Sequence, residues 1–172
     1  MTATDPRYHL AQLNVARPRA PLDSPQLAGF VSRLDEVNAL ADAAPGFVWR
    51  LVDDSGTNAT GLRPYGPDVM VNLSVWESID SLYDFAYRTA HLDVLRQRRE
   101  FFDHEGLDAY AVLWWIPAGT VPTVADAKAR LESLRRRGPT PEAFSFRSPF
   151  PAPDGLGPDA GDAVGEDWFC PT

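Results

Sequence analysis

The chain has 172 residues, 44% of them hydrophobic, which predicts one folded domain with a real core rather than a disordered chain. Its formal net charge is −8, which argues against a nucleic-acid partner, and its single cysteine, Cys170, excludes an internal disulfide. No run is apolar and long enough to span a bilayer, so we expect a soluble cytoplasmic protein with neither membrane nor nucleic acid as a partner.

The first predicted elements are a strand and a helix. Residues Tyr8 to Ala16 alternate in polarity, which indicates a strand with Gln12 and Asn14 on one face. A helix with one apolar stripe is expected from Ser24 to Leu40, with Pro25 in the favoured first position.

A second strand and a long connection follow. Phe47 to Val52 alternates, which places Phe47 and Trp49 on one face and Arg50 on the other. The connection from Asp53 to Asp68 is rich in glycine and proline and is too long for a tight hairpin. It is interpreted either as a lid over a site or as a surface loop.

The third strand and the second helix carry most of the candidate site. Residues Val69 to Trp76 alternate, with Asn72 and Trp76 on the half-polar face. A long helix is expected from Ser78, whose hydroxyl can cap its first turn, through to Phe102. Helical spacing predicts one stripe that contains Asp84, Tyr87, Arg88, His91, Leu95 and Arg98.

The last elements are an apolar strand and a capped helix. Tyr110 to Ile116 is apolar on both faces, which is typical of a central strand and sends Trp114 and Trp115 to opposite sides. Thr123 with Asp126 has the spacing of a capping box. The helix that begins there is expected to end at Gly138.

The element order predicts the fold class. Strand, helix, strand, strand, helix, strand is the order of a ferredoxin-like α+β sandwich, in which both helices cover one sheet face. We expect this domain, with its C-terminal helix, over residues 1–147, and a flexible tail rich in proline, glycine and aspartate over residues 148–172. The other face of the sheet must be covered by something.

Five segments between Tyr8 and Phe150 carry a resemblance to a known family. They are HLAQLNVARPRAPLD, PGFVWRL, VNLSVWES, YRTAHLDVLRQRREFF and LWWIPAGTVPTVADAKARLESLRRRGPTPEAFSF. Together they resemble an uncharacterised bacterial domain-of-unknown-function family of the dimeric α/β-barrel superfamily, which is antibiotic-biosynthesis-monooxygenase-like. The resemblance implies a homodimer in which two sheets pair face to face.

The wider superfamily includes monooxygenases without a cofactor, haem-degrading monooxygenases and haem enzymes such as aldoxime dehydratases. The haem-degrading branch uses an asparagine on the first strand, a tryptophan at the end of the third, and a histidine ligand on the second helix. Asn14, Trp76 and His91 lie in comparable places here, although the interval from Trp76 to His91 is about a helical turn longer.

His91 is the first candidate for chemistry. A neutral imidazole can act as a general base or ligate haem iron, and the nearby Arg88 and Arg98 disfavour its protonated form. The structural alternative is a histidine that is hydrogen-bonded at the edge of a helix.

Polar residues on the strands form the second group of candidates. Asn14, Arg50, Asn72 and Ser74 can converge on one sheet face, either to bind a substrate oxygen or to hydrogen-bond across a dimer interface. Arg50 is suited to gripping a carboxylate or phenolate. Trp76 either stacks on a flat ligand or packs in the core.

The sequence therefore predicts a monooxygenase-like enzyme acting on a small, flat, apolar metabolite. The expected catalytic residues are His91, Asn14 and Arg50. The expected substrate-binding residues are Trp76, Asn72, Arg88, Tyr87 and Trp114. One alternative is a haem enzyme with His91 as axial ligand, and another is a non-catalytic module that binds a small ligand.

Overall fold

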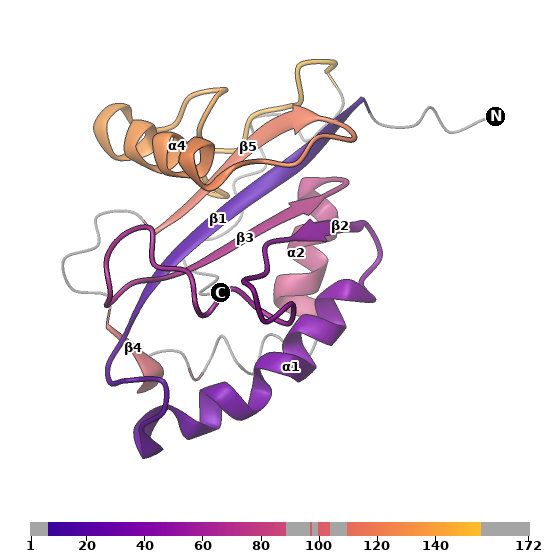
Figure 1. Cartoon of the computed structure of the whole chain (residues 1–172). Helices are drawn as coiled ribbons and strands as arrows, with labels where there is room; N and C mark the ends of the chain where they lie inside the picture. The colour runs from indigo at the N-terminus through magenta and orange to yellow at the C-terminus, as the bar shows by residue number, and fades with distance from the viewer. Residues whose placement is uncertain (1–6, 89–96, 98–99, 104–109, 156–172) are drawn as a thin grey trace.

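The computed structural model describes residues 7–88, 97, 100–103 and 110–155 and centres on one antiparallel sheet (Figure 1). The strands are β1 (Tyr8–Pro18), β2 (Phe47–Arg50), β3 (Met70–Trp76), β4 (Phe102–Asp103) and β5 (Ala111–Pro117). β1 lies between β3 and β5, β2 pairs with the far side of β3, and the short β4 pairs with the end of β1. This arrangement confirms the α+β class.

Helices cover both faces of the sheet. A short 3-10 turn, η1 (Pro25–Leu27), leads into α1 (Ala28–Asp42), and α2 (Ile79–Arg88) follows β3. Figure 1 shows α1 and α2 on one face and α4 (Val124–Arg137) on the other. Within the described part of the chain, no helix is both long and apolar enough to cross a membrane.

The predicted helix boundaries rest on observed caps. The Thr123 hydroxyl accepts a hydrogen bond from the Asp126 backbone N–H at 3.0 Å, and the Ser78 hydroxyl accepts one from the Ser81 N–H at 3.1 Å. Gly138, which follows the last residue of α4, has a φ of +74°, a conformation that costs glycine little.

Alternation along the strands separates two sheet faces. The α1–α2 face carries the even-numbered residues of β1 and β3, and the α4 face carries the odd-numbered ones. On the α4 face, a buried aliphatic layer packs against α4 through Ala127, Leu131 and Leu134. The α1–α2 face is apolar at its two ends and polar in between.

The connection between β2 and β3 packs on the α4 face. Leu62 and Tyr65 contact the core there, and the Lys128 ammonium of α4 donates to the Pro64 carbonyl at 2.9 Å. Lys128 also lies 5.0 Å from the centre of the Tyr65 ring. This connection is therefore a packed cover, and together with α4 it occupies the sheet face that a face-to-face dimer would use.

Tyr65 gives the fold a predicted alkaline limit. Burial raises the pKa of its hydroxyl to about 12, and the hydroxyl has no hydrogen-bond partner within the described ranges. Because the unfolded tyrosine titrates near 10, the unfolded state loses its proton first and stability falls between about pH 10 and pH 12. Tyr65→Phe is expected to remove this part of the decline in urea titrations across that range. An unchanged decline would contradict the assignment.

Three sequence expectations about positions were wrong. β5 is not a central strand, because among the described strands it pairs with β1 alone and meets Phe144 only through an isolated bridge. A β-bulge between Phe47 and Trp49 breaks the alternation in β2, so Phe47 pairs with Trp76 whereas Trp49 faces the α4 side. Phe102 is not in the long helix but in β4, where its ring packs edge-on against Phe30 at 4.9 Å.

Part of the expected tail is packed on the domain. Ala152 is buried, and the Phe150 carbonyl accepts a hydrogen bond from the Trp115 indole N–H at 2.9 Å. The ring of Phe150 contacts that of Phe144. Apolar side chains beyond residue 147 thus cover part of β5, and the rest of the predicted tail, 156–172, lies outside the described residues.

Candidate functional site

A polar stripe crosses the middle of the α1–α2 face. Antiparallel register places Gln12 opposite Ser74 and Asn14 opposite Asn72, so four polar side chains share one face of β1 and β3. Gln12, Asn14 and Ser74 are buried, and Asn14 has no exposed surface. Polar groups in such a place destabilise the fold unless they are hydrogen-bonded.

The hydrogen bonds in this stripe form a chain from Trp76 through Ser74 to Gln12. The Trp76 indole N–H donates to the Ser74 hydroxyl at 2.9 Å, and that hydroxyl donates to Gln12 Oε1 at 2.7 Å. Gln12 Nε2 and both polar atoms of the Asn14 carboxamide have no partner among the described residues. Each such group costs about 1–3 kcal/mol when buried unpaired, so we expect a bound water molecule or ligand to pair with these atoms.

A small cavity lies beside the stripe. Its volume is about 30 Å³, and α1, β2, β3, β1 and α2 all contribute to its walls. The lining residues are Gln12, Val37, Asn38, Ala41, Phe47, Arg50, Asn72, Ser74, Trp76, Leu82 and Phe85. The cavity is large enough for a water molecule or a molecule of dioxygen size. Its walls are mostly apolar, with polar groups gathered on the sheet side.

Trp76 is a buried aromatic wall of this cavity. Its indole stacks on Phe85 with ring centres 5.1 Å apart, and Phe47 meets it edge-on at 5.3 Å. The Phe85 ring therefore already occupies one stacking face of the indole. The structure accordingly gives Trp76 a packing role in addition to its position at the cavity.

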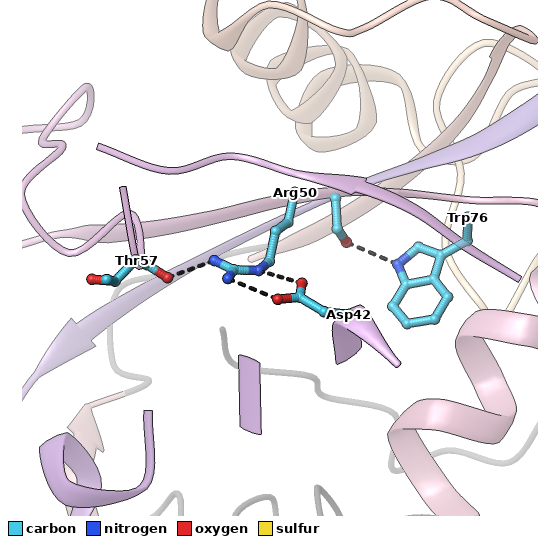
Figure 2. A network of polar contacts seen from close by, with 5 residues as sticks. Asp42, Arg50, Thr57 and Trp76 are labelled. Atoms are coloured by element: carbon cyan, nitrogen blue, oxygen red, sulfur yellow. Dashed lines mark hydrogen bonds and ion pairs between the residues drawn. The ribbon is translucent and has the colours of Figure 1, made fainter. Parts of the chain in front are cut away.

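Arg50 closes the cavity where α1 meets β2. Its guanidinium donates to both carboxylate oxygens of Asp42, at 2.7 and 3.1 Å, and to the Thr57 carbonyl at 2.7 Å. Figure 2 shows this network and Trp76 on the same side of the sheet. Because Asp42 neutralises the guanidinium, Arg50 can grip a substrate carboxylate only if this ion pair opens.

The structure separates the other sequence candidates. Trp114 lies on the α4 face, away from the cavity. Arg88 is 72% exposed and pairs with Asp84 at 3.2 Å, whereas the Tyr87 ring packs on Tyr83 at 4.7 Å. Neither these three candidates nor Asn14 is among the described residues that line the cavity, and His91 lies outside the described residues.

The sequence did not identify two of the cavity residues, Gln12 and Asn38, as candidates for the site. Gln12 shares its strand face with Asn14 and lies two residues earlier, so the same alternation identifies it. Asn38 lies four residues after Leu34 on the apolar stripe of α1, and a polar residue at that spacing is a signal of a site.

The described residues that line the cavity supply no ligand for haem iron, and the predicted ligand, His91, lies outside the described residues. Haem iron in proteins is held by histidine, cysteine, methionine or tyrosine, and the described lining residues include none of these. Nor do the described parts of the chain contain a cluster of three metal-binding side chains.

Comparisons with known proteins give one family match. Residues 9–159 match the family described as "Domain of unknown function (DUF3291)". No curated protein sequence matches the chain.

Several solved structures resemble about two thirds of the chain, among them the following three. SnoaB from Streptomyces nogalater, described as a cofactor-independent oxygenase, is 19% identical over 67% of this chain and 98% of its own, with a TM-score of 0.43. PA3566 from Pseudomonas aeruginosa is 11% identical over 68% of this chain and 100% of its own, with a TM-score of 0.46. NE2512 from Nitrosomonas europaea, a protein of unknown function, is 12% identical over 69% of this chain and 98% of its own, with a TM-score of 0.43.

Proposed function

The chain belongs to the DUF3291 family, and we propose that it is a monooxygenase-like enzyme that acts on a small, flat, largely apolar molecule. The reaction is of the kind named for SnoaB, a cofactor-independent oxygenase. One observation carries the proposal: the buried Gln12 carboxamide, whose Nε2 is unpaired among the described residues, lines a cavity with mostly apolar walls, and the unpaired Asn14 carboxamide lies two residues further along the same strand face.

The carboxamides suit a substrate that becomes an oxyanion. Gln12 Nε2 and Asn14 Nδ2 are N–H donors without acceptors in the described part of the chain. Fixed donors in a site of low polarity stabilise a negative oxygen, such as that of an enolate or phenolate, more strongly than water does. Such an anion is electron-rich enough to react with dioxygen directly.

The proposed reaction converts an activated CH2 group and dioxygen into a ketone and water. A base removes one C–H proton, and the resulting enolate forms a C–O bond with dioxygen to give a hydroperoxide after protonation. The second C–H bond and the O–O bond then break and water leaves. Carbon is oxidised by the same four electrons that reduce dioxygen, so no external reductant is consumed.

Each residue of the site has a proposed part. His91 is proposed as the base, and Asn14 with Gln12 as the groups that hold the substrate oxygen. Asn72 and Trp76 line the cavity and orient the substrate plane. Arg50 is proposed to orient the substrate after its ion pair with Asp42 opens.

Admission of a substrate requires the cavity wall to move. A volume of about 30 Å³ is far below the several hundred Å³ of an ordinary ligand site. The Arg50–Asp42 pair joins α1 to β2 at this wall, and the Asp42 side chain is 46% exposed. The Arg50 side chain is only 17% exposed and its contact with Asp42 is bidentate, so this pair costs more to open than an ordinary surface pair and substrate binding has to offset that cost.

The assembly and location are also proposals. The family resemblance implies a homodimer, and we propose that any dimer forms away from the α4 face, because α4 and the β2–β3 connection already cover it. Sedimentation that shows only monomer at micromolar concentration would contradict the homodimer. A cytoplasmic location, with neither membrane nor nucleic acid as a partner, is proposed from the composition alone.

The function is tested by oxygen uptake with anthrone, a flat tricyclic ketone with one doubly activated CH2 group, and with related phenols. We expect uptake above the enzyme-free rate for at least one of these compounds. Asn72→Ala should lower this rate by roughly a hundredfold, because Asn72 lines the cavity and orients the substrate, and a misplacement of about 1 Å has an effect of this size.

Trp114→Phe is the matched control, because Trp114 is as buried as Trp76 but lies on the α4 face. Its rate should match the wild type. Binding of these compounds without oxygen uptake would indicate a ligand-binding module instead of an enzyme. Equal rates in Asn72→Ala and the wild type would contradict the proposed site.

A further inference from the structure

A second, larger cavity lies at the C-terminal end of β1, opposite the end at which Leu10 pairs with Trp76. Register pairs Ala16 at the end of β1 with Met70 at the start of β3, so the segments beyond these two residues meet at one end of the sheet. The cavity between them has a volume of about 620 Å³ and shares no described lining residue with the first. Its lining residues are Arg17, Pro18, Arg19, Ala20, Pro21, Leu22, Asp23, Arg63, Pro67 and Asp68.

Two arginines of this cavity are held in place by backbone carbonyls. Arg19 Nε donates to the Phe102 carbonyl at 3.1 Å. Arg63 Nε donates to the Pro67 carbonyl at 3.2 Å, and its Nη1 donates to the carbonyls of Leu62, at 2.8 Å, and Thr60. These bonds orient the guanidinium groups without neutralising them, because a carbonyl carries no net charge.

The positive charge of these two arginines has no ion-pair partner among the described residues. Asp23 and Asp68 line the same cavity, yet neither comes within ion-pair distance of Arg19 or Arg63. Arg50, by contrast, is fully engaged by Asp42. Arginines that are fixed in place and unneutralised in a concave site are suited to bind carboxylates and phosphates, since less side-chain entropy is lost on binding.

The remaining walls suit an organic body. Proline rings at 18, 21 and 67, together with Leu22, supply a rigid apolar surface. We propose that this cavity binds a small organic anion, with its carboxylate or phosphate group between Arg19 and Arg63 and its apolar part against the prolines. The volume falls within the range of ordinary small-molecule sites.

The test is a calorimetric titration of the full chain with benzoate and, separately, with inorganic phosphate, at matched ionic strength in chloride. We expect at least one of the two anions to saturate the protein. Arg19→Gln should weaken that binding about tenfold or more, because it removes a charge-assisted contact. Arg63→Lys, which keeps the charge but loses the forked geometry, should weaken it as well.

Arg33→Gln is the matched control, since Arg33 is an arginine outside the cavity whose Nη1 donates to a neutral acceptor, Gln97 Oε1, at 3.3 Å. It should bind with the wild-type affinity. Saturation by benzoate alone assigns the site to carboxylates, and saturation by phosphate alone assigns it to phosphoryl groups. Failure of both anions to saturate the wild type, or equal binding in Arg19→Gln and Arg33→Gln, would overturn the proposal. Neither result tests the function proposed for the first cavity, which Trp76 lines.

Discussion

Replacing Asn14 by leucine is expected to make the protein more stable and at the same time inactive. The Asn14 carboxamide has no exposed surface and no hydrogen-bond partner in the described part of the chain, so the fold bears the cost of its desolvation. Leucine is close to it in shape and has no polar atom to satisfy. The free energy of unfolding should therefore rise by about 2 kcal/mol, while oxygen uptake falls by roughly a hundredfold.

Urea unfolding and the oxygen assay measure the two effects on one preparation. Ser74→Ala is the comparison variant, for which we expect the free energy of unfolding to fall rather than rise. The Ser74 hydroxyl is hydrogen-bonded to both Trp76 and Gln12, so its removal leaves two buried polar groups unpaired. It should lower the free energy of unfolding by about 1–3 kcal/mol. If Asn14→Leu instead destabilises the protein as Ser74→Ala does, Asn14 is a structural residue and the proposed ligand site loses its main support.

Replacing Trp76 by alanine is expected to have the largest effect on stability. The indole is 1% exposed and packs between Phe47 and Phe85, so its removal leaves a large void in the core of the α1–α2 face. Such truncations cost about 3–5 kcal/mol, a large share of the 5–15 kcal/mol that stabilises an ordinary domain. Urea unfolding at low temperature measures the loss.

Trp114→Ala separates packing from function. Trp114 is also 1% exposed, so the two variants should lose similar stability. Only Trp76→Ala should weaken substrate binding, because only Trp76 lines the cavity beside the carboxamides. Equal substrate affinity in the two variants would reduce Trp76 to a core residue.

Local patterns predicted the strand faces well where the strands are regular. Alternation in β1 and β3 correctly placed Asn14, Asn72 and Trp76 on one face, because a residue period of two leaves no other choice in an unbroken strand. The caps at Ser78 and Thr123 were equally readable, since a short polar side chain satisfies N–H groups only a few residues away. The match of residues 9–159 also confirms the predicted resemblance to a domain-of-unknown-function family.

The errors arose where contacts with distant parts of the chain determine the local structure. The bulge in β2 shifts its register against β3 by one residue. Nothing in the sequence from Phe47 to Arg50 indicates this shift, because it depends on the pairing with β3. Phe102 lies one helical turn beyond the stripe that ends at Arg98, yet pairing with the end of β1 places it in a strand. Arg88 and Tyr87 share a helical stripe with His91, but a stripe does not show which of its turns reaches the sheet centre.

The candidate site was harder to predict than the fold. Its cavity walls come from five elements, and sequence spacing relates residues only within one element. Arg50 illustrates this limit. Its residue type suggested anion binding, but its partner Asp42 lies at the end of α1, and only the tertiary structure brings the two together.

The cover on the α4 face has a consequence for how the molecule behaves on dilution. Helix α4 and the connection with Leu62 and Tyr65 close that side of the core from within one polypeptide. This face of the core does not depend on a partner subunit for its cover, so dilution that separates a dimer formed elsewhere should leave the α4 face buried. This side of the core can thus stay covered at scarce cellular copy numbers, at which an obligate pair of bare sheets would come apart.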